Sequence, residues 1–289
     1  MADKDIDEFS GTETTGHEWD GIKELDTPMP RWWINTFYIC IIWAIGYMIL
    51  YPAWPLISDY TRGYLGYSSR AELSAEMVAA RSEQQVYLDQ IDVASLEEIL
   101  ASPGLRQFAT AGGRSAFLVN CTQCHGAGAQ GSPGYPNLND DDWIWGGTLD
   151  DIYLTIRHGI RFTSDWDTRD STMPAFGRDE ILNRAEITDI AAHVRSIAGL
   201  EHDASAATRG ALGYADNCAA CHGDNGEGLQ ELGAPALGDT IWFYGKSTVE
   251  IAAQITNPKH GVMPAWVDRL DDTIIKQLAV YVHSLGGGE

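Results

Sequence analysis

Two five-residue stretches, CTQCH at residues 121–125 and CAACH at residues 218–222, decide the fold of this 289-residue chain. On a helix, this spacing places two thiols and an imidazole near one edge of a planar macrocycle. A lone cysteine pair would fit a redox pair or half a zinc site, but a histidine that follows at once is the attachment signal for a c-type haem. The sequence therefore predicts two covalently bound haem c groups. The expected residues are Cys121, Cys124, Cys218 and Cys221 for the thioether bonds, and His125 and His222 as axial ligands.

The chain around the two motifs repeats itself. Phe117 before the first motif corresponds to Tyr214 before the second at an offset of 97 residues, and Met-Pro-Ala at 173–175 recurs at 263–265. The matches keep their order while the offsets drift with loop length, which indicates two copies of one helical domain. Each copy is too short for a large core, so a bulky apolar haem would form most of its interior. The expected domains are residues 106–200 and 201–289.

Each iron needs a second axial ligand from the other face of the haem, and methionine is its usual source in electron-carrying c-type cytochromes. The chain has six methionines, and Met173 and Met263 are the two that precede Pro-Ala-aromatic downstream of a haem motif. The competing interpretation is that both fill gaps in an apolar core, but their repeated context favours ligation. We expect each methionine to bind the iron of its own repeat. An exchanged arrangement stays open if the two methionine loops face each other.

Residues 31–57 form the expected transmembrane anchor. No Asp, Glu, Lys or Arg occurs between residues 32 and 58, and the densest part, residues 32–51, would span about 30 Å as a helix, which matches the hydrocarbon core of a bilayer. Aromatic residues at both ends resemble the belts found at membrane interfaces. A buried core helix seldom lacks charge for so long. A cleaved signal peptide is not expected, because an acidic tail precedes a long apolar stretch.

The segments on either side of the anchor differ in character. Residues 1–30 are acidic with few large apolar residues, which predicts a disordered cytoplasmic tail. Residues 58–105 read as a helical connector for spacing and docking, where Ser69 and Ser95 each precede a glutamate by three residues, as in a capping box. The positive-inside rule gives no orientation. Covalent haem attachment takes place outside the cytoplasm, so the haem domains are expected in the periplasm, anchored to a bacterial inner membrane.

The overall charge excludes some classes of function. With 41 acidic and 19 basic residues the net charge is −22, which argues against nucleic acid as a partner. A basic partner would fit an acidic face, although solubility explains such a balance equally well. The sequence contains no Walker loop, Gly-x-Ser-x-Gly or His-Glu-x-x-His motif. Two six-coordinate irons leave no open site for oxygen or peroxide, so we expect outer-sphere electron transfer and no catalytic residue.

An insertion before Met173 has no counterpart in the second repeat, and it contains Arg161 and Arg169. Arginine often pairs with haem propionates because its guanidinium matches carboxylate geometry. The hypothesis is that these two side chains pair with the first haem, in which case replacing them would shift its midpoint potential.

The residues in and around the anchor segment allow a more specific comparison with known families. PRWW at residues 30–33, YPAWP at 51–55 and GYSSR at 66–70, followed by two haem motifs, resemble the di-haem third subunit of cbb3-type cytochrome c oxidases over nearly the whole chain. The resemblance implies an all-α fold with one N-terminal transmembrane helix followed by two tandem class I cytochrome c domains. It also assigns the family's four attachment cysteines, two axial histidines and two axial methionines to the residues named above.

The same resemblance implies an electron-input subunit of a terminal oxidase that reduces oxygen and translocates protons. Its expected partners are a soluble or membrane-bound cytochrome c donor, a mono-haem cytochrome c subunit and the haem-copper catalytic subunit. Alternatives are the di-haem cytochrome subunit of a membrane dehydrogenase and a di-haem peroxidase. The matched Met-Pro motifs argue against the peroxidase, because it needs an iron that can open a coordination site. A haem-based sensor would need an output domain, for which the sequence has no candidate.

Overall fold

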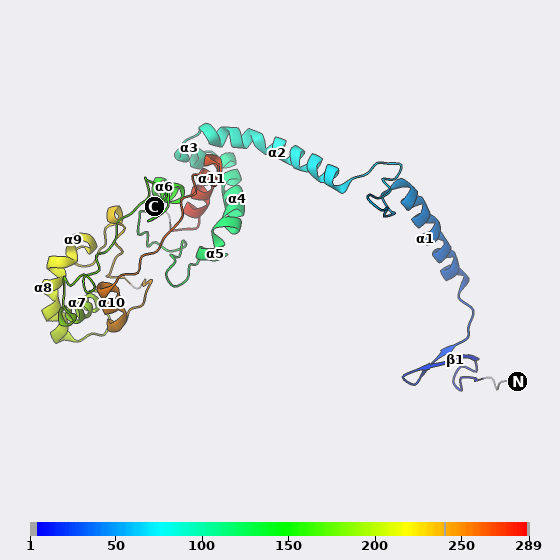
Figure 1. The fold of residues 1–289 in the computed structure, drawn as a ribbon, viewed down its shortest axis with the longest axis horizontal. Helices are drawn as coiled ribbons and strands as arrows, with labels where there is room; N and C mark the ends of the chain where they lie inside the picture. The colour runs from blue at the N-terminus through cyan, green and yellow to red at the C-terminus, as the bar shows by residue number, and fades with distance from the viewer. Residues whose placement is uncertain (1–4, 240, 288–289) are drawn as a thin grey trace. The chain divides into compact units, whose positions relative to one another are not determined.

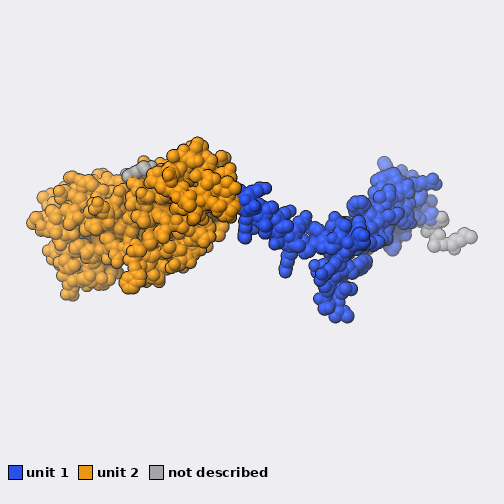
Figure 2. All heavy atoms as spheres, turned by 90° about the horizontal axis from the view of Figure 1, so that it is seen from above, with its two compact units in different colours: residues 1–83 blue, residues 84–289 orange. Residues whose placement is uncertain are grey.

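In the computed structural model, the chain forms two compact units, residues 1–83 and 84–289, each of which is described by itself (Figure 2). The structure describes residues 5–239 and 241–287. The fold is mostly helical, as expected. The elements are β1 Thr14–Trp19, β2 Ile22–Leu25, α1 Arg31–Leu50, α2 Ser69–Val93, α3 Leu96–Ala101, α4 Pro103–Asn120, α5 Thr122–His125, α6 Leu149–His158, α7 Arg184–Ile197, α8 Ala204–Asn217, α9 Ala219–His222, the short 3-10 helix η1 Gln230–Leu232, α10 Thr248–Thr256 and α11 Asp272–His283.

The acidic tail differs from the expected disorder. Strands β1 and β2 form an antiparallel hairpin in which Thr14 lies opposite Leu25. Asp20 and Gly21 at its tip both have positive φ, 50° and 83°. This is the turn that an Asp-Gly pair favours, because its twist matches that of the strands. The local turn chemistry thus orders residues 14–25 in a segment whose low content of large apolar residues predicted no structure.

Helix α1 coincides with the expected anchor segment. Among the described residues it is the one helix long and apolar enough to cross a membrane, and none of its residues is buried. The chain then turns back, and the N–H groups of Tyr64 and Leu65 donate to the carbonyls of Ile49 and Leu50 at 2.9 and 3.0 Å. These bonds satisfy carbonyls that the end of a helix leaves without partners.

Helix α2 begins within the expected connector, with the Ser68 hydroxyl rather than Ser69 accepting from a first-turn N–H. Its C-terminal part belongs to the second unit: Ile91 is fully buried there, and Tyr87 stacks on Phe108 of α4 at 4.8 Å. The capping box predicted at Ser95 is present at the start of α3. Residues 84–105 are therefore part of the packed unit and more than a spacer.

The second unit contains two apolar cores. The first core includes Phe117 of α4, Ile152 of α6 and Leu278 of α11. The second core includes Ile190 of α7 and Tyr214 of α8, with residues of α10. Helix α11 packs on α4 and α6, while α7 packs on α8 and α10 (Figure 1).

The two sequence repeats have therefore exchanged their last helices. The expected arrangement was two consecutive domains, 106–200 and 201–289, each closed by its own last helix. Instead α7 of the first repeat closes the second core, and α11 of the second repeat closes the first. The link between α7 and α8 is only residues 198–203, and short links make consecutive helices antiparallel neighbours. Once α7 packs on α8, α11 remains to cover α4.

Glycines allow both helix pairs to approach closely. A methyl group on Gly113 of α4 would collide with the backbone of Gln277 and lie 2.7 Å from Cβ of Tyr281, both in α11. A methyl group on Gly210 of α8 would collide with the backbone of Asp189 in α7. Gly113 and Gly210 occupy equivalent repeat positions, so both crossings follow one packing rule.

Candidate functional site

Each cysteine motif begins where a long helix ends. Cys121 caps the C-terminus of α4 and Cys218 caps that of α8, and a single turn of helix follows in each case. The N–H of His125 donates to the carbonyl of Cys121 at 3.0 Å, and His222 and Cys218 do the same at 2.9 Å. All four motif thiols are free. Burial, with a smaller effect of the neighbouring thiol, raises the pKa of Cys121 and of Cys218 to about 11, so these thiols are protonated at neutral pH.

The two histidines are held in one tautomer. Nδ1 of His125 lies 3.2 Å from the carbonyl oxygen of Pro136, and Nδ1 of His222 lies 2.9 Å from that of Pro235. A carbonyl can only accept, so Nδ1 carries the proton in both rings. Burial lowers the pKa of both imidazoles, partly opposed by these hydrogen bonds. The neutral ring with a lone pair on Nε2 is the form that binds a metal ion.

The methionine expectation is where the structure departs most from the simpler prediction. Met263 of the second repeat packs against the first core, together with Cys121. Met173 of the first repeat packs against the second core, together with Cys218. The methionine loops thus exchange along with the last helices. This packing is the geometry that an exchanged ligation, the alternative that the sequence left open, would need.

Backbone contacts between the repeats hold the exchanged loops. Met263 and Ile160 exchange two hydrogen bonds, N–H to carbonyl, at 2.9 and 3.0 Å. The N–H of Met173 donates to Nε2 of His260 at 3.1 Å. Beyond Met173, the N–H of Arg178 donates to the carbonyl of Thr256 at 2.9 Å. Each methionine is therefore fixed by residues of the other repeat.

A single cavity of about 770 Å³ joins both motifs and both methionines. Its wall includes Trp242 Nε1 and Thr155 Oγ1, two buried polar atoms without a partner among the described residues. Buried polar atoms normally have hydrogen-bond partners, so these two atoms indicate that a polar group binds inside the cavity. The apolar walls, the motif cysteines, the two motif histidines and the two methionines that line this cavity together fit a large planar apolar group with polar edges, as a haem has.

The two arginines of the insertion both lie over Trp145 but differ in their polar partners. Arg161 lines the cavity, and its guanidinium lies 5.9 Å from the ring of Trp145. The guanidinium of Arg169 also lies over Trp145, at 5.6 Å, but pairs with Asp151 at 3.0 Å. The sequence predicted one role for both arginines, whereas the structure gives their side chains different polar partners.

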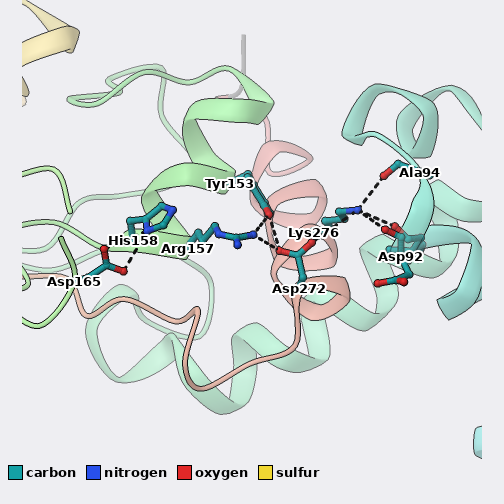
Figure 3. A network of polar contacts seen from close by, with 9 residues as sticks. Asp92, Ala94, Tyr153, Arg157, His158, Asp165, Asp272 and Lys276 are labelled. Carbon is teal, nitrogen blue, oxygen red and sulfur yellow. Dashed lines mark hydrogen bonds and ion pairs between the residues drawn. The ribbon is translucent and has the colours of Figure 1, made fainter. Parts of the chain in front are cut away.

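A polar network braces the first half of the site (Figure 3). Arg157 and Tyr153 of α6 both contact Asp272 of α11. Lys276 of α11 lies 3.8 Å from Asp272, and it also donates to three carbonyls at the end of α2. The network fixes α6, which leads to Ile160, against α11, which follows the Met263 loop. No motif in the sequence marked these residues, because they lie more than a hundred positions apart.

Two further polar groups lie on this side of the unit. Nδ1 of His158 lies 3.1 Å from a carboxylate oxygen of Asp165, and the ligand atoms of His158, Asp165 and Asp167 all lie within 4.8 Å of one another. Asp142 lines the cavity, and burial, followed by repulsion from Asp239 and Asp140, raises its pKa to about 6.

Comparisons with known proteins agree along the whole chain. Residues 11–58 match the family described as the N-terminal domain of cytochrome oxidase-cbb3, FixP; residues 110–198 match cytochrome c; and residues 205–282 match cytochrome c oxidase, cbb3-type, subunit III. The chain is 54% identical over 291 residues to the cbb3-type cytochrome c oxidase subunit FixP of Sinorhizobium medicae, with 100% of both chains covered. It is 52% identical over 296 residues to subunit CcoP of Azospirillum brasilense, again with 100% of both covered. With subunit CcoP of Cereibacter sphaeroides the identity is 50% over 276 residues, 96% of this chain and 95% of the relative.

Proposed function

Because this chain belongs to the family of di-haem FixP/CcoP subunits of cbb3-type cytochrome c oxidases, we propose that it carries two covalent haem c groups and passes electrons through them to the oxidase core. Haem c binding follows from its cytochrome c domains. The two attachment motifs that line one cavity support the proposal of two haems. The family assignment does not support the dehydrogenase subunit or the peroxidase as alternatives.

The proposed ligand sets are crossed between the repeats. Cys121 and Cys124 attach the first haem, and its iron takes His125 and Met263. Cys218 and Cys221 attach the second, and its iron takes His222 and Met173. The observation that carries this assignment is the packing of each methionine in the core that holds the other repeat's cysteines.

The chain's own residues orient the ligands and exclude water. The Nδ1–H bonds to Pro136 and Pro235 fix the two rings and increase the basicity of Nε2. The bound haem supplies a one-electron change at iron, and histidine–methionine ligation keeps its potential high. The histidine and methionine side chains would hold each iron and keep water away from it, so the haem would supply one-electron transfer without a bond between iron and a substrate.

The same proposal gives the topology and partners. Residues 31–57 anchor the chain in the inner membrane, the tail at residues 1–30 lies in the cytoplasm, and the haem domains lie in the periplasm. Electrons arrive from a soluble or membrane-bound cytochrome c and leave to the mono-haem subunit and then the haem-copper subunit. Purification from native membranes in mild detergent should yield the chain together with haem b and copper, and mass spectrometry should find two added porphyrins.

Single-haem variants of the full chain test the crossed ligation. Replacing Cys218 and Cys221 by alanine leaves the haem at Cys121. In that protein, Met263→Ala should abolish the sulfur-to-iron charge-transfer band of the oxidised haem, and Met173→Ala should leave it. The variant without Cys121 and Cys124 should show the reverse. If each methionine instead affects the haem of its own repeat, the crossed assignment is wrong.

A further inference from the structure

Arg161 lies between the two methionine loops. Its Nε donates to the carbonyl of Gly261 at 2.7 Å, and its Nη1 donates to the carbonyl of Ser171 at 2.9 Å. Gly261 precedes Met263 by two residues, and Ser171 precedes Met173 by two residues. One guanidinium therefore contacts the same position in both loops, although the loops belong to different repeats.

The backbone conformation at Arg161 is constrained by its neighbours. Arg161 has a φ of 51°, in the left-handed region that is uncommon for residues other than glycine. Its N–H donates to the carbonyl of Arg169 at 2.7 Å, and the preceding residue, Ile160, is paired with Met263. Trp145 packs below the guanidinium. Such strain persists only where the surrounding structure over-determines it.

We propose that Arg161 is a positioning residue that closes both methionine loops, so that one side chain sets how often each iron keeps its sulfur ligand. The inference rests on the crossed ligation of the proposed function. It differs from pairing with a propionate, because the acceptors are two backbone carbonyls of the loops.

The chemistry of arginine suits this role and that of lysine does not. The guanidinium is planar and presents Nε and Nη1 as donors in fixed, divergent directions, whereas an ammonium is a point charge on a flexible stem. Lysine would keep the positive charge near both haems but could not hold both carbonyls in the same geometry. The pair of substitutions therefore separates positioning from a simple effect of charge.

The test uses the purified full-length protein with both haems attached. Imidazole can bind an oxidised iron only after the methionine sulfur has left, so its apparent affinity reports how often each loop opens. Losing one hydrogen bond of a charged donor shifts such an equilibrium about tenfold or more. We expect Arg161→Lys and Arg161→Gln to raise the apparent imidazole affinity of both irons about tenfold and to weaken both charge-transfer bands. Arg169→Lys is the matched control, since Arg169 lies over the same tryptophan but bonds Asp151, and it should behave as wild type.

The outcomes are distinguishable. Wild-type affinity at both irons in Arg161→Lys, or in Arg161→Gln if the lysine variant does not fold, would overturn the inference. So would a change at one iron only, or an equal change in Arg169→Lys. If the wild-type protein itself has no charge-transfer band, the proposed ligation fails, and that result is separate from any effect of Arg161.

Discussion

The exchanged helices make a strong prediction about Gly113. In Gly113→Ala, the new methyl group would collide with the backbone of Gln277 and lie 2.7 Å from Cβ of Tyr281. Backbone atoms cannot move aside as a flexible side chain can, so α4 and α11 must separate. Phe117 of α4 and Leu278 of α11, which are almost completely buried in the core that these helices share, then pack less closely.

The magnitude follows from two opposing effects. Overpacking of a well-packed core costs typically about 1 to 3 kcal/mol, and a forced backbone contact lies at the upper end of that range. Alanine in a helix interior offsets about 1 kcal/mol of this cost, because glycine is the poorer helix former. The expected net loss in free energy of unfolding is about 2 kcal/mol, which lowers the melting temperature by about 4 to 8 °C in a unit of this size.

Thermal unfolding followed by circular dichroism in detergent measures this loss. Gly104→Ala in the same helix is the matched control, because a methyl group there meets nothing within 4 Å, and it should leave stability unchanged or slightly raised. Gly113→Ala should also weaken the charge-transfer band of the first haem, since α11 follows the Met263 loop. A melting temperature at or above that of Gly104→Ala would refute the packing described for α4 and α11.

Three smaller predictions concern single side chains. The pKa of Asp142 is raised from 3.8 to about 6, so between these two values the folded state holds a proton that the unfolded chain releases. The free energy of unfolding should therefore rise by about 1 to 2 kcal/mol as pH falls from 7 to 4, allowing for solvent screening. Thermal melts of Asp142→Asn should lack this rise. Lys276→Met should lower the free energy of unfolding by about 2 kcal/mol, because three carbonyls at the end of α2 lose their donor. Amide hydrogen exchange at the end of α2 should accelerate, and unchanged exchange would contradict the contact. Tyr214→Phe should cost about 1 kcal/mol in denaturant titrations, since the hydroxyl donates to the carbonyl of Gly223 at 2.8 Å; an unchanged midpoint would show that this bond contributes nothing.

The sequence predicted the features that depend on neighbours along the chain. A cysteine, a second cysteine and a histidine within five positions share one helical turn, so the cluster at Cys121 follows from spacing alone. The same is true of the apolar anchor, whose length matches a bilayer, and of the capping box at Ser95. The hairpin also follows from local chemistry, because Asp20-Gly21 is a strong turn signal, whereas the acidic composition of the segment predicted disorder.

Tertiary structure alone decided which methionine accompanies which motif. Because the repeats are alike, α7 and α11 present similar apolar faces, and either could cover Phe117 of α4 by pattern alone. The short link at residues 198–203 favours α7 beside α8, and the close glycine crossings complete the exchange. Local sequence thus determined the chemistry of each half-site, whereas long-range packing determined the pairing, because equivalent surfaces can be told apart only by the connections between them.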